Sequence, residues 1–242
     1  MTNSHKKGFT LIEILIASTI FAIIMIMATA VFSMTSSYNA KIRETRNSLS
    51  EARGTMMKIS DDVRLSNGSV KITAGTTADV LVRDVFLVQT DQSGSFSTTS
   101  GNIVRPGGTN PDETINYNSN NYYSLGVLKK TDSKIILYRT LVTASGDHDL
   151  YRREYTISDE VSSNEWKGTI NLNTNQNFRE EIVNNEVSLN ARFWGFMASS
   201  GIQQPFVRIG IFAQSKDYDN LLPNYRAQAE IKTSVESRDY NP

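Results

Sequence analysis

A single carboxylate stands at the head of a long apolar segment near the N-terminus. Glu13 follows the dipeptide Gly8-Phe9, and no charged residue occurs between Glu13 and Lys41. A free carboxylate buried at membrane depth costs several kcal/mol unless it is paired or neutralised. The sequence therefore predicts either an ion pair for Glu13 or a position at the membrane surface, where its carboxylate reaches the lipid headgroups.

The residues around this carboxylate form a short motif, which reads Lys6, Lys7, Gly8, Phe9, Thr10, Leu11, Ile12 and Glu13. The motif resembles the class III signal peptide of type IV pilins and of the pseudopilins of type II secretion systems. The resemblance implies that a prepilin peptidase/N-methyltransferase cleaves on the cytoplasmic side, between Gly8 and Phe9, and methylates Phe9. It also implies that Glu13, the fifth mature residue, pairs with the α-amino group of a neighbouring subunit's first residue. Such an amine is mostly cationic at neutral pH.

The same stretch could instead form an ordinary secretory signal. The basic leader would then be its n-region, and Ala28-Thr29-Ala30 would fit an A-x-A site cut before Val31. Residues 14–34 form an apolar run that is longer than the roughly 7–15 residues of such a signal. The run is long enough to cross a bilayer, which takes about 20 residues. The length and the internal acid favour a membrane span.

The basic leader also predicts an orientation. Lys6 and Lys7 precede the span, so the N-terminus should be cytoplasmic, although Lys41, Arg43 and Arg46 follow the span and weaken this bias. Beyond the span no run is apolar enough to cross again. We therefore expect a single-pass protein of the cytoplasmic (inner) membrane, with the rest of the chain outside the cytoplasm.

Composition narrows the function classes. The chain has 242 residues, enough for an anchor and one sizeable domain, and its formal net charge is zero. Nothing suggests a nucleic-acid binder driven by electrostatics. The chain contains no cysteine, which excludes disulfides, thiolate metal sites and a lipoprotein anchor.

A long helix is predicted to continue beyond the membrane, because neither glycine nor proline occurs over 9–53. A mainly apolar stripe recurs there at spacings of three and four, at Tyr38, Ile42, Thr45, Leu49, Ala52, Met56, Ile59 and Val63. Charged residues are expected on the other face, at Lys41, Arg43, Glu44, Arg46, Glu51, Arg53, Lys58 and Asp62.

This spacing is typical of an amphipathic helix, and Asn67-Gly68 is a stop signal. We predict a leader at 1–8, a membrane and assembly helix at 9–36 and its amphipathic continuation at 37–66. The apolar face could form a coiled-coil seam or pack on a sheet of the same chain. The resemblance to pilins implies the second arrangement.

The remainder, 67–242, is predicted to be a β-rich globular domain, which makes the fold class α+β with an antiparallel sheet. Alternation of apolar and polar residues predicts strands at 79–89, 134–143, 149–157, 165–171, 187–193, 207–211 and 227–235. A short turn of helix is predicted at 177–184. The stretches 90–124 and 215–224 are predicted to be loops, the first with one short strand at most.

No arrangement of catalytic residues is evident, so we expect no enzyme and no cofactor. His148 lies in Gly146-Asp147-His148-Asp149, which is typical of a solvated hairpin turn, although its side chains could contact a metal. Asp217 and Asp219 are a weak candidate for a calcium site, because oxygen ligands suit that ion.

Three further segments narrow the resemblance. J-type pseudopilins and W-type minor pilins are resembled by three segments, which are 46–64, 150–155 and the last strand at 231–235. That likeness implies a subunit that initiates assembly or sits near the filament tip, with other pilin or pseudopilin subunits and an inner-membrane assembly platform as partners. Two alternatives remain: a DNA-uptake or adhesive pilin that uses Arg152 and Arg153, and an anchored binding domain that never polymerises.

Overall fold

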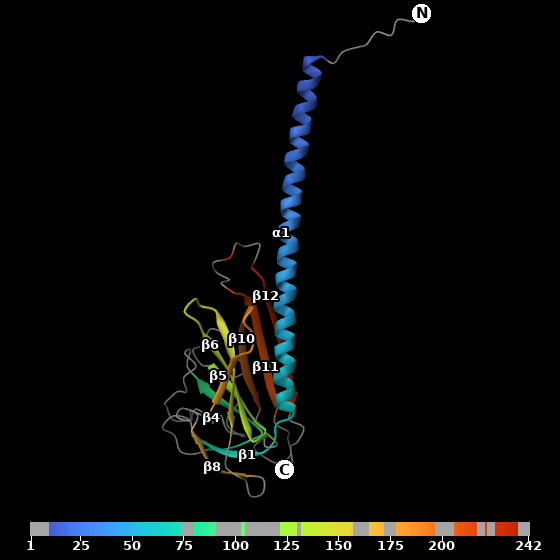
Figure 1. Cartoon of the computed structure of the whole chain (residues 1–242). Coiled ribbons are helices and arrows are strands. Elements are labelled where there is room, and N and C mark those ends of the chain that lie inside the picture. Colours follow the sequence, from blue (N-terminus) through green and yellow to red (C-terminus); the bar gives the residue numbers. More distant parts are fainter. Residues whose placement is uncertain are drawn as a thin grey trace, which may run out of the picture.

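The computed structural model describes residues 10–73, 80–90, 103–104, 122–129, 132–156, 165–171, 178–196, 206–216, 221 and 226–236. One long N-terminal helix runs along a β-rich body and projects far beyond it (Figure 1). The α+β class predicted from the sequence is confirmed. The leader residues Lys6, Lys7 and Gly8, together with Phe9, lie outside the described residues.

Helix α1 (Leu11–Arg64) contains 54 residues, which corresponds to a length of about 80 Å at 1.5 Å per residue. It begins after the N-cap Thr10 and ends at Arg64, and the N–H of the C-cap Leu65 donates to the Asp61 carbonyl at 3.0 Å. Gly68 follows with φ 104°, a backbone conformation that favours glycine. The predicted helix over 9–66 is therefore confirmed to within two residues at each end.

The described strands are β1 (Ser69–Thr73), β2 (Val80–Arg83), β3 (Val85–Thr90), β4 (Ile103–Val104), β5 (Tyr122–Lys129), β6 (Lys134–Val142), β7 (His148–Thr156), β8 (Glu165–Asn171), β9 (Phe178–Ile182), β10 (Val187–Phe196), β11 (Phe206–Ser215) and β12 (Gln228–Glu236). They form three sheets, ordered β4-β3-β5-β6-β7-β9, β10-β11-β12 and β2-β1-β8. The described pairings between strands are antiparallel except that of β1 with β8.

The main core lies where the lower half of α1 covers the sheet β10-β11-β12 (Figure 1). Ala52, Met56, Ile59 and Val63 from the helix are buried there. They meet apolar side chains that alternate along the strands, at Val187, Leu189, Ala191, Phe193, Val207, Ile209, Ile211, Ala213 and Val235. From Ala52 onward the apolar stripe of α1 thus packs on a sheet of its own chain, as predicted, whereas Tyr38 and Ile42 at its start are exposed.

The strand predicted at 79–89 is wrong as a single element. The structure divides it into β2 and β3, which belong to different sheets, at Asp84. Asp84 has φ 46°, and its N–H donates to the Gly68 carbonyl at 2.9 Å. An aspartate tolerates this left-handed conformation better than most residues, so a run that reads as one strand turns a corner there.

The helical turn predicted at 177–184 is also wrong, because this stretch contains strand β9. Its residues pair with β7, with Glu180 opposite Arg153 and Glu181 opposite Arg152. Backbone pairing with β7 and these cross-strand charges stabilise an extended chain, and neither is visible in local sequence. The parallel pairing of β1 with β8 was likewise not predicted.

Candidate functional site

The head of α1 is closed by a capping box between Thr10 and Glu13. The Thr10 N–H and hydroxyl both donate to Glu13 Oε2, at 2.8 and 3.0 Å, and the Glu13 N–H donates to Thr10 Oγ1 at 3.3 Å. Such a box satisfies backbone donors that the first turn of a helix leaves open. Glu13 is therefore part of the helix start, a role that the sequence analysis did not assign to it.

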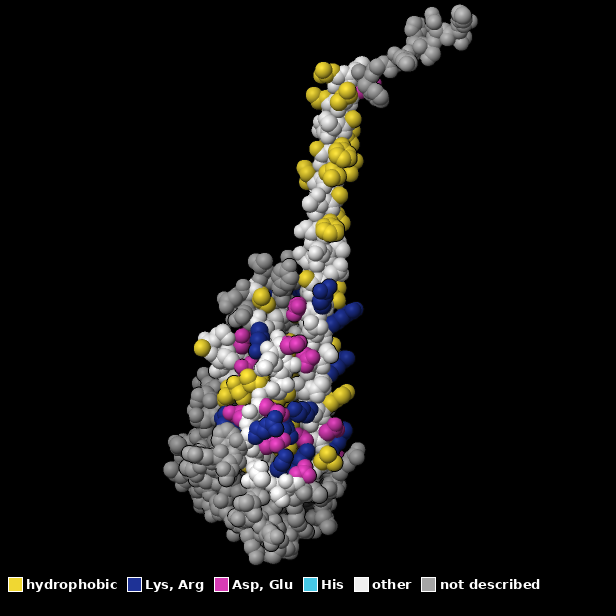
Figure 2. All heavy atoms as spheres, in the orientation of Figure 1, with side chains coloured by type: hydrophobic (Ala, Val, Ile, Leu, Met, Phe, Trp, Pro, Cys, Tyr) yellow, Lys and Arg dark blue, Asp and Glu magenta, His cyan; other side chains and the backbone are white. Residues whose placement is uncertain are grey.

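The upper half of α1 has no cover within the part of the chain that the structure describes. Every residue over 11–36 is exposed. The most apolar 18-residue stretch of α1 has a mean hydropathy of 2.6. Figure 2 shows apolar side chains along the whole length of this bare rod. By length and composition, α1 is able to cross a membrane.

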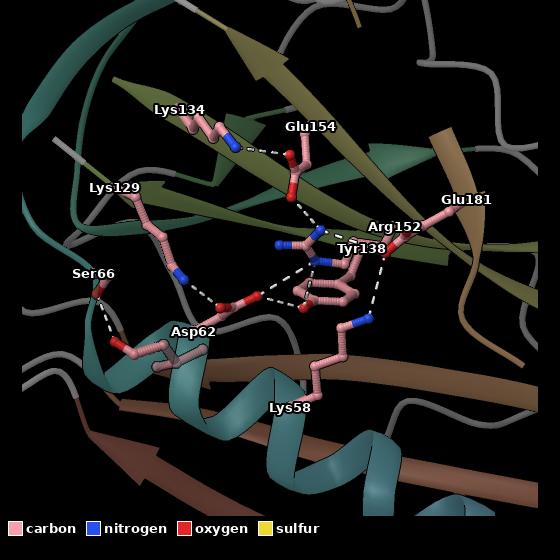
Figure 3. A network of polar contacts seen from close by, with 10 residues as sticks. Lys58, Asp62, Ser66, Lys129, Lys134, Tyr138, Arg152, Glu154 and Glu181 are labelled. Carbon is pink, nitrogen blue, oxygen red and sulfur yellow. Dashed lines mark hydrogen bonds and ion pairs between the residues drawn. The ribbon is translucent and has the colours of Figure 1, made fainter. Parts of the chain in front are cut away.

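The opposite end of α1 is fixed to the sheet β4-β3-β5-β6-β7-β9 by a buried carboxylate. Asp62 accepts hydrogen bonds from Lys129 Nζ and from the Tyr138 hydroxyl, the latter at 2.5 Å, and Arg152 Nε lies 3.6 Å from Asp62 Oδ2 (Figure 3). Arg152 Nε also donates to the Tyr138 oxygen at 3.2 Å. We call these four residues, Asp62, Lys129, Tyr138 and Arg152, the Asp62 clamp.

Burial sets the electrostatics of the clamp. Burial and the negative charge of Asp62 raise the pKa of Tyr138 well above its ordinary value of 10.0, so the phenol keeps its proton and donates it to the carboxylate. Burial alone would lower the pKa of Arg152, but its interactions with Tyr138 and Glu154 raise it above its ordinary value. The phenol therefore stays neutral, and the guanidinium stays charged, across the physiological pH range.

Further charged side chains adjoin the clamp on the side of Arg152 (Figure 3). Arg152 Nη1 contacts Glu154 and lies 3.5 Å from Glu181, which Lys58 of α1 also reaches at 3.4 Å. Lys134 contacts Glu154 at 3.2 Å. The lower end of α1 is thus connected to β6, β7 and β9 by alternating charges, which fixes the direction in which the upper half projects.

Asp62 was predicted to lie on the solvent face of the helix, and the structure shows that this is wrong, since only 7% of the residue is exposed. It lies three residues after Ile59 and seven after Thr55, both of which are buried. Residues spaced by three and four share a helix face. This spacing was a signal in the sequence that Asp62 borders the core.

The structure gives no open basic patch at Arg152 and Arg153. Arg152 contacts three acids, and Arg153 Nε donates to Glu180 Oε1 at 3.0 Å. Arg139 reaches the same Glu180 oxygen at 2.6 Å. Because these arginines form ion pairs within the fold, they do not form the exposed basic cluster that a DNA-uptake pilin would need.

The turn at Asp147-His148-Asp149 differs from its prediction. The hairpin between β6 and β7 is present, with Gly146 at φ 86°, but Asp147 and Asp149 are only 7% and 8% exposed and are not solvated. Burial and the positive charge of Arg192 lower the pKa of His148. No group of three potential metal ligands occurs among the described residues, and Asp217 and Asp219 lie outside them.

Comparison with protein families gave one informative match. A family model described as the prokaryotic N-terminal methylation motif matches residues 3–29, which contain Gly8, Phe9 and Glu13. Comparison with curated proteins and with solved structures gave no match. The motif and the apolar helix support anchoring in a membrane, and they indicate a structural subunit more than an enzyme. Together they support a type IV pilin or pseudopilin family for the chain.

Proposed function

We propose that the chain is a minor pilin or pseudopilin, a structural subunit of a type IV pilus or of a type II secretion-like filament. The observation that carries the proposal is the division of α1 into two halves. The lower half buries one face against the chain's own sheet, whereas the upper half exposes an apolar surface directly after a prepilin motif. Exposed apolar surface of this extent requires a membrane or other helices to cover it.

The proposed sequence of insertion, processing and assembly begins in the cytoplasmic membrane. Lys6 and Lys7 hold the N-terminus inside, and a prepilin peptidase/N-methyltransferase cleaves between Gly8 and Phe9 and methylates Phe9. The leader is then 1–8, the membrane and assembly segment 9–36, its amphipathic continuation 37–66 and the globular part 67–242. An inner-membrane assembly platform extracts the mature chain into an extracytoplasmic filament, where other pilin or pseudopilin subunits cover the apolar segment.

Glu13 has two roles in this proposal. The three bonds of the capping box use Oε2 and the Glu13 N–H, so Oε1 makes no hydrogen bond to another described residue. One oxygen can therefore hold the chain's own helix start while the other accepts the α-amine of a neighbouring subunit's Phe9. Two opposite charges are better tolerated in an apolar filament core than one, and the pair would fix the axial register between subunits.

A position at or near the filament tip is the finer part of the proposal. It is supported by the likeness of 46–64, 150–155 and 231–235 to J-type pseudopilins and W-type minor pilins, and by a length of 242 residues. An initiating subunit would be made in few copies. Its tip partners would be other minor subunits.

Mass spectrometry of the protein from its native membrane tests the processing. We expect a chain that starts at Phe9 and carries one added methyl group. A start at Val31 would indicate an ordinary secreted domain, and an intact Met1 would indicate a simple anchor. Either result would overturn the proposal.

The Glu13 variants test the assembly role. Glu13→Ala should be inserted and cleaved normally but should enter filaments poorly, because the α-amine of the neighbour loses its partner. Glu13→Gln is the matched control, since it can retain the capping hydrogen bonds without the charge. We expect both variants to fail in assembly, and normal incorporation of Glu13→Gln would rule out the ion pair.

A further inference from the structure

The lower half of α1 carries a row of arginines on the face that points away from the sheets. Arg43, Arg46, Ser50, Arg53 and Met57 follow one another at spacings of three and four, so they share one helix face. All five are exposed, and together they form what we call the arginine face. Figure 2 shows Lys and Arg side chains projecting along this side of the helix, away from the β-rich body.

The arginines of this face are not neutralised within the part of the chain that the structure describes. The ion pairs found there do not include Arg43, Arg46 or Arg53. Of the acids nearby, Glu51 is turned toward the domain and accepts a hydrogen bond from Asn184. Asp61 lies further along the helix, where it pairs with Arg64 at 3.7 Å. Glu44 lies on the flank and is partly buried.

Lipid headgroups cannot account for the whole arginine face. At 1.5 Å per residue, Arg53 lies about 28 Å beyond Met34, the last residue of the apolar run. The headgroup layer adds only about 5–8 Å on each side of the hydrocarbon. Arg53 is therefore out of reach of the membrane surface, and lipid headgroups cannot neutralise this part of the row.

A second copy of the chain is a poor neighbour for this face. Between Ser36 and Met57 this side of the helix contains three positive charges and no negative one. If two copies of the chain packed through this stretch, each arginine would therefore lie opposite another arginine or an uncharged residue. Juxtaposed like charges disfavour binding and act as selection against wrong partners. The face is also continuous with the apolar segment of the same helix, which other filament subunits are proposed to cover.

We propose that the arginine face docks an acidic helix of a different filament subunit, and that it selects this neighbour over another copy of the chain. This inference rests on the proposed function and deepens it, because it names the chemistry of the adjoining subunit. It also explains why a filament would contain few copies of this chain. The charge pattern disfavours packing of one copy against another, although the assembly helix is fully formed.

Disulfide cross-linking can test the selection, because the natural chain contains no cysteine. Ser50→Cys places a single reporter in the middle of the arginine face. Two differently tagged full-length chains with this reporter are placed together in phosphatidylcholine vesicles, one with the natural face and one with Arg43→Glu, Arg46→Glu and Arg53→Glu. The charge-reversed chain serves as the acidic probe, since its helix is otherwise identical.

The mixed pair should cross-link roughly fivefold more than either chain with itself, as expected from three exposed charge pairs. Added salt should reduce this preference for the mixed pair, because it screens exposed charges. A triple Arg→Lys variant is the matched control and should behave as the natural face. A reporter at Ser234→Cys, an exposed position on β12, should show no preference.

Equal cross-linking of all three pairs would overturn the inference. A fluorophore on the thiol of the Ser50→Cys variant tests for contact with lipid. If spin-labelled phosphatidylglycerol headgroups quench this fluorophore and cross-linking is independent of charge, the arginine face contacts lipid, and the inference is overturned. Neither result depends on cleavage. A chain correctly processed at Phe9 but without charge selection would therefore refute this inference alone and leave the proposed function standing.

Discussion

The two halves of α1 are built from similar apolar residues but lie in opposite surroundings. Ile24 in the upper half is 57% exposed, whereas Ile59 in the lower half is fully buried against the sheet β10-β11-β12. Both isoleucines lie in one uninterrupted helix, so local structure is not what separates them. The difference shows that the fold of the domain needs only the lower half, and that the upper half is available to a membrane or to other chains.

The acidic residues at the two ends of α1 show the same contrast. Asp62 is buried and receives contacts from Lys129, Tyr138 and Arg152, each distant in sequence. Glu13 is exposed and bonds only Thr10 among the described residues. The first carboxylate is satisfied within the domain, and the second is satisfied only by its own helix start. In the proposed function, the cationic partner of Glu13 comes from another molecule.

The largest effect on stability is expected from Asp62→Ala. This change leaves Tyr138, Lys129 and Arg152 without their shared acceptor, and breaking a buried charge cluster in this way typically costs about 3–5 kcal/mol. Asp61→Ala is the matched control, because its carboxylate is exposed and its ion pair with Arg64 contributes less than about 1 kcal/mol. Urea denaturation of the full chain in detergent micelles, followed by tryptophan fluorescence, gives both values. Equal losses would show that the clamp does not hold the helix.

The comparison between the halves is tested directly by Ile59→Ala and Ile24→Ala. The first removes a fully buried side chain and should cost about 2–5 kcal/mol of unfolding free energy. The second removes the same atoms from a position that no described part of the domain covers, so the denaturation midpoint should not move. A shift with Ile24→Ala would mean that the domain, after all, contacts the upper half of the helix.

Gly126→Ala tests how rigid the body behind α1 is. A Cβ at this position in β5 would lie 2.1–2.5 Å from ring atoms of Phe86, which is completely buried in β3. Overpacking of this kind typically costs about 1–3 kcal/mol. Gly54→Ala in α1 is the control, because nothing lies within 4 Å and alanine favours the helix, so it should stabilise slightly. A neutral Gly126→Ala would indicate that Phe86 moves aside easily.

The smallest effect is a change in pH dependence from Glu154. Burial alone would raise its pKa, but hydrogen bonds and charges from Arg152 and Lys134 lower it below its ordinary value of 4.5. A lowered carboxyl pKa contributes stability that is fully present above pH 4.5 and is lost as the pH falls through the lowered value. Glu154→Gln should therefore flatten the acid side of the stability curve. An unchanged curve would show that Glu154 is not coupled to folding.

The parts of the molecule that local pattern decides could be predicted from the sequence. The helix over 9–66, its apolar face and the last three strands follow from spacings of three and four or from alternation. The break at Asp84 and strand β9 could not be predicted, because each depends on a partner elsewhere: the Gly68 carbonyl for Asp84 and strand β7 for β9.

The candidate site divides in the same way. The processing motif and Glu13 could be recognised because the determinants lie within a few adjacent residues, and the family match covers this stretch. The Asp62 clamp could not, since Asp62 and Tyr138 are 76 positions apart in the chain. The sequence by itself determined that the chain has a prepilin motif and one long amphipathic helix. Only the tertiary structure decided which part of that helix is buried and which charges are satisfied, because burial depends on what distant strands bring against each face.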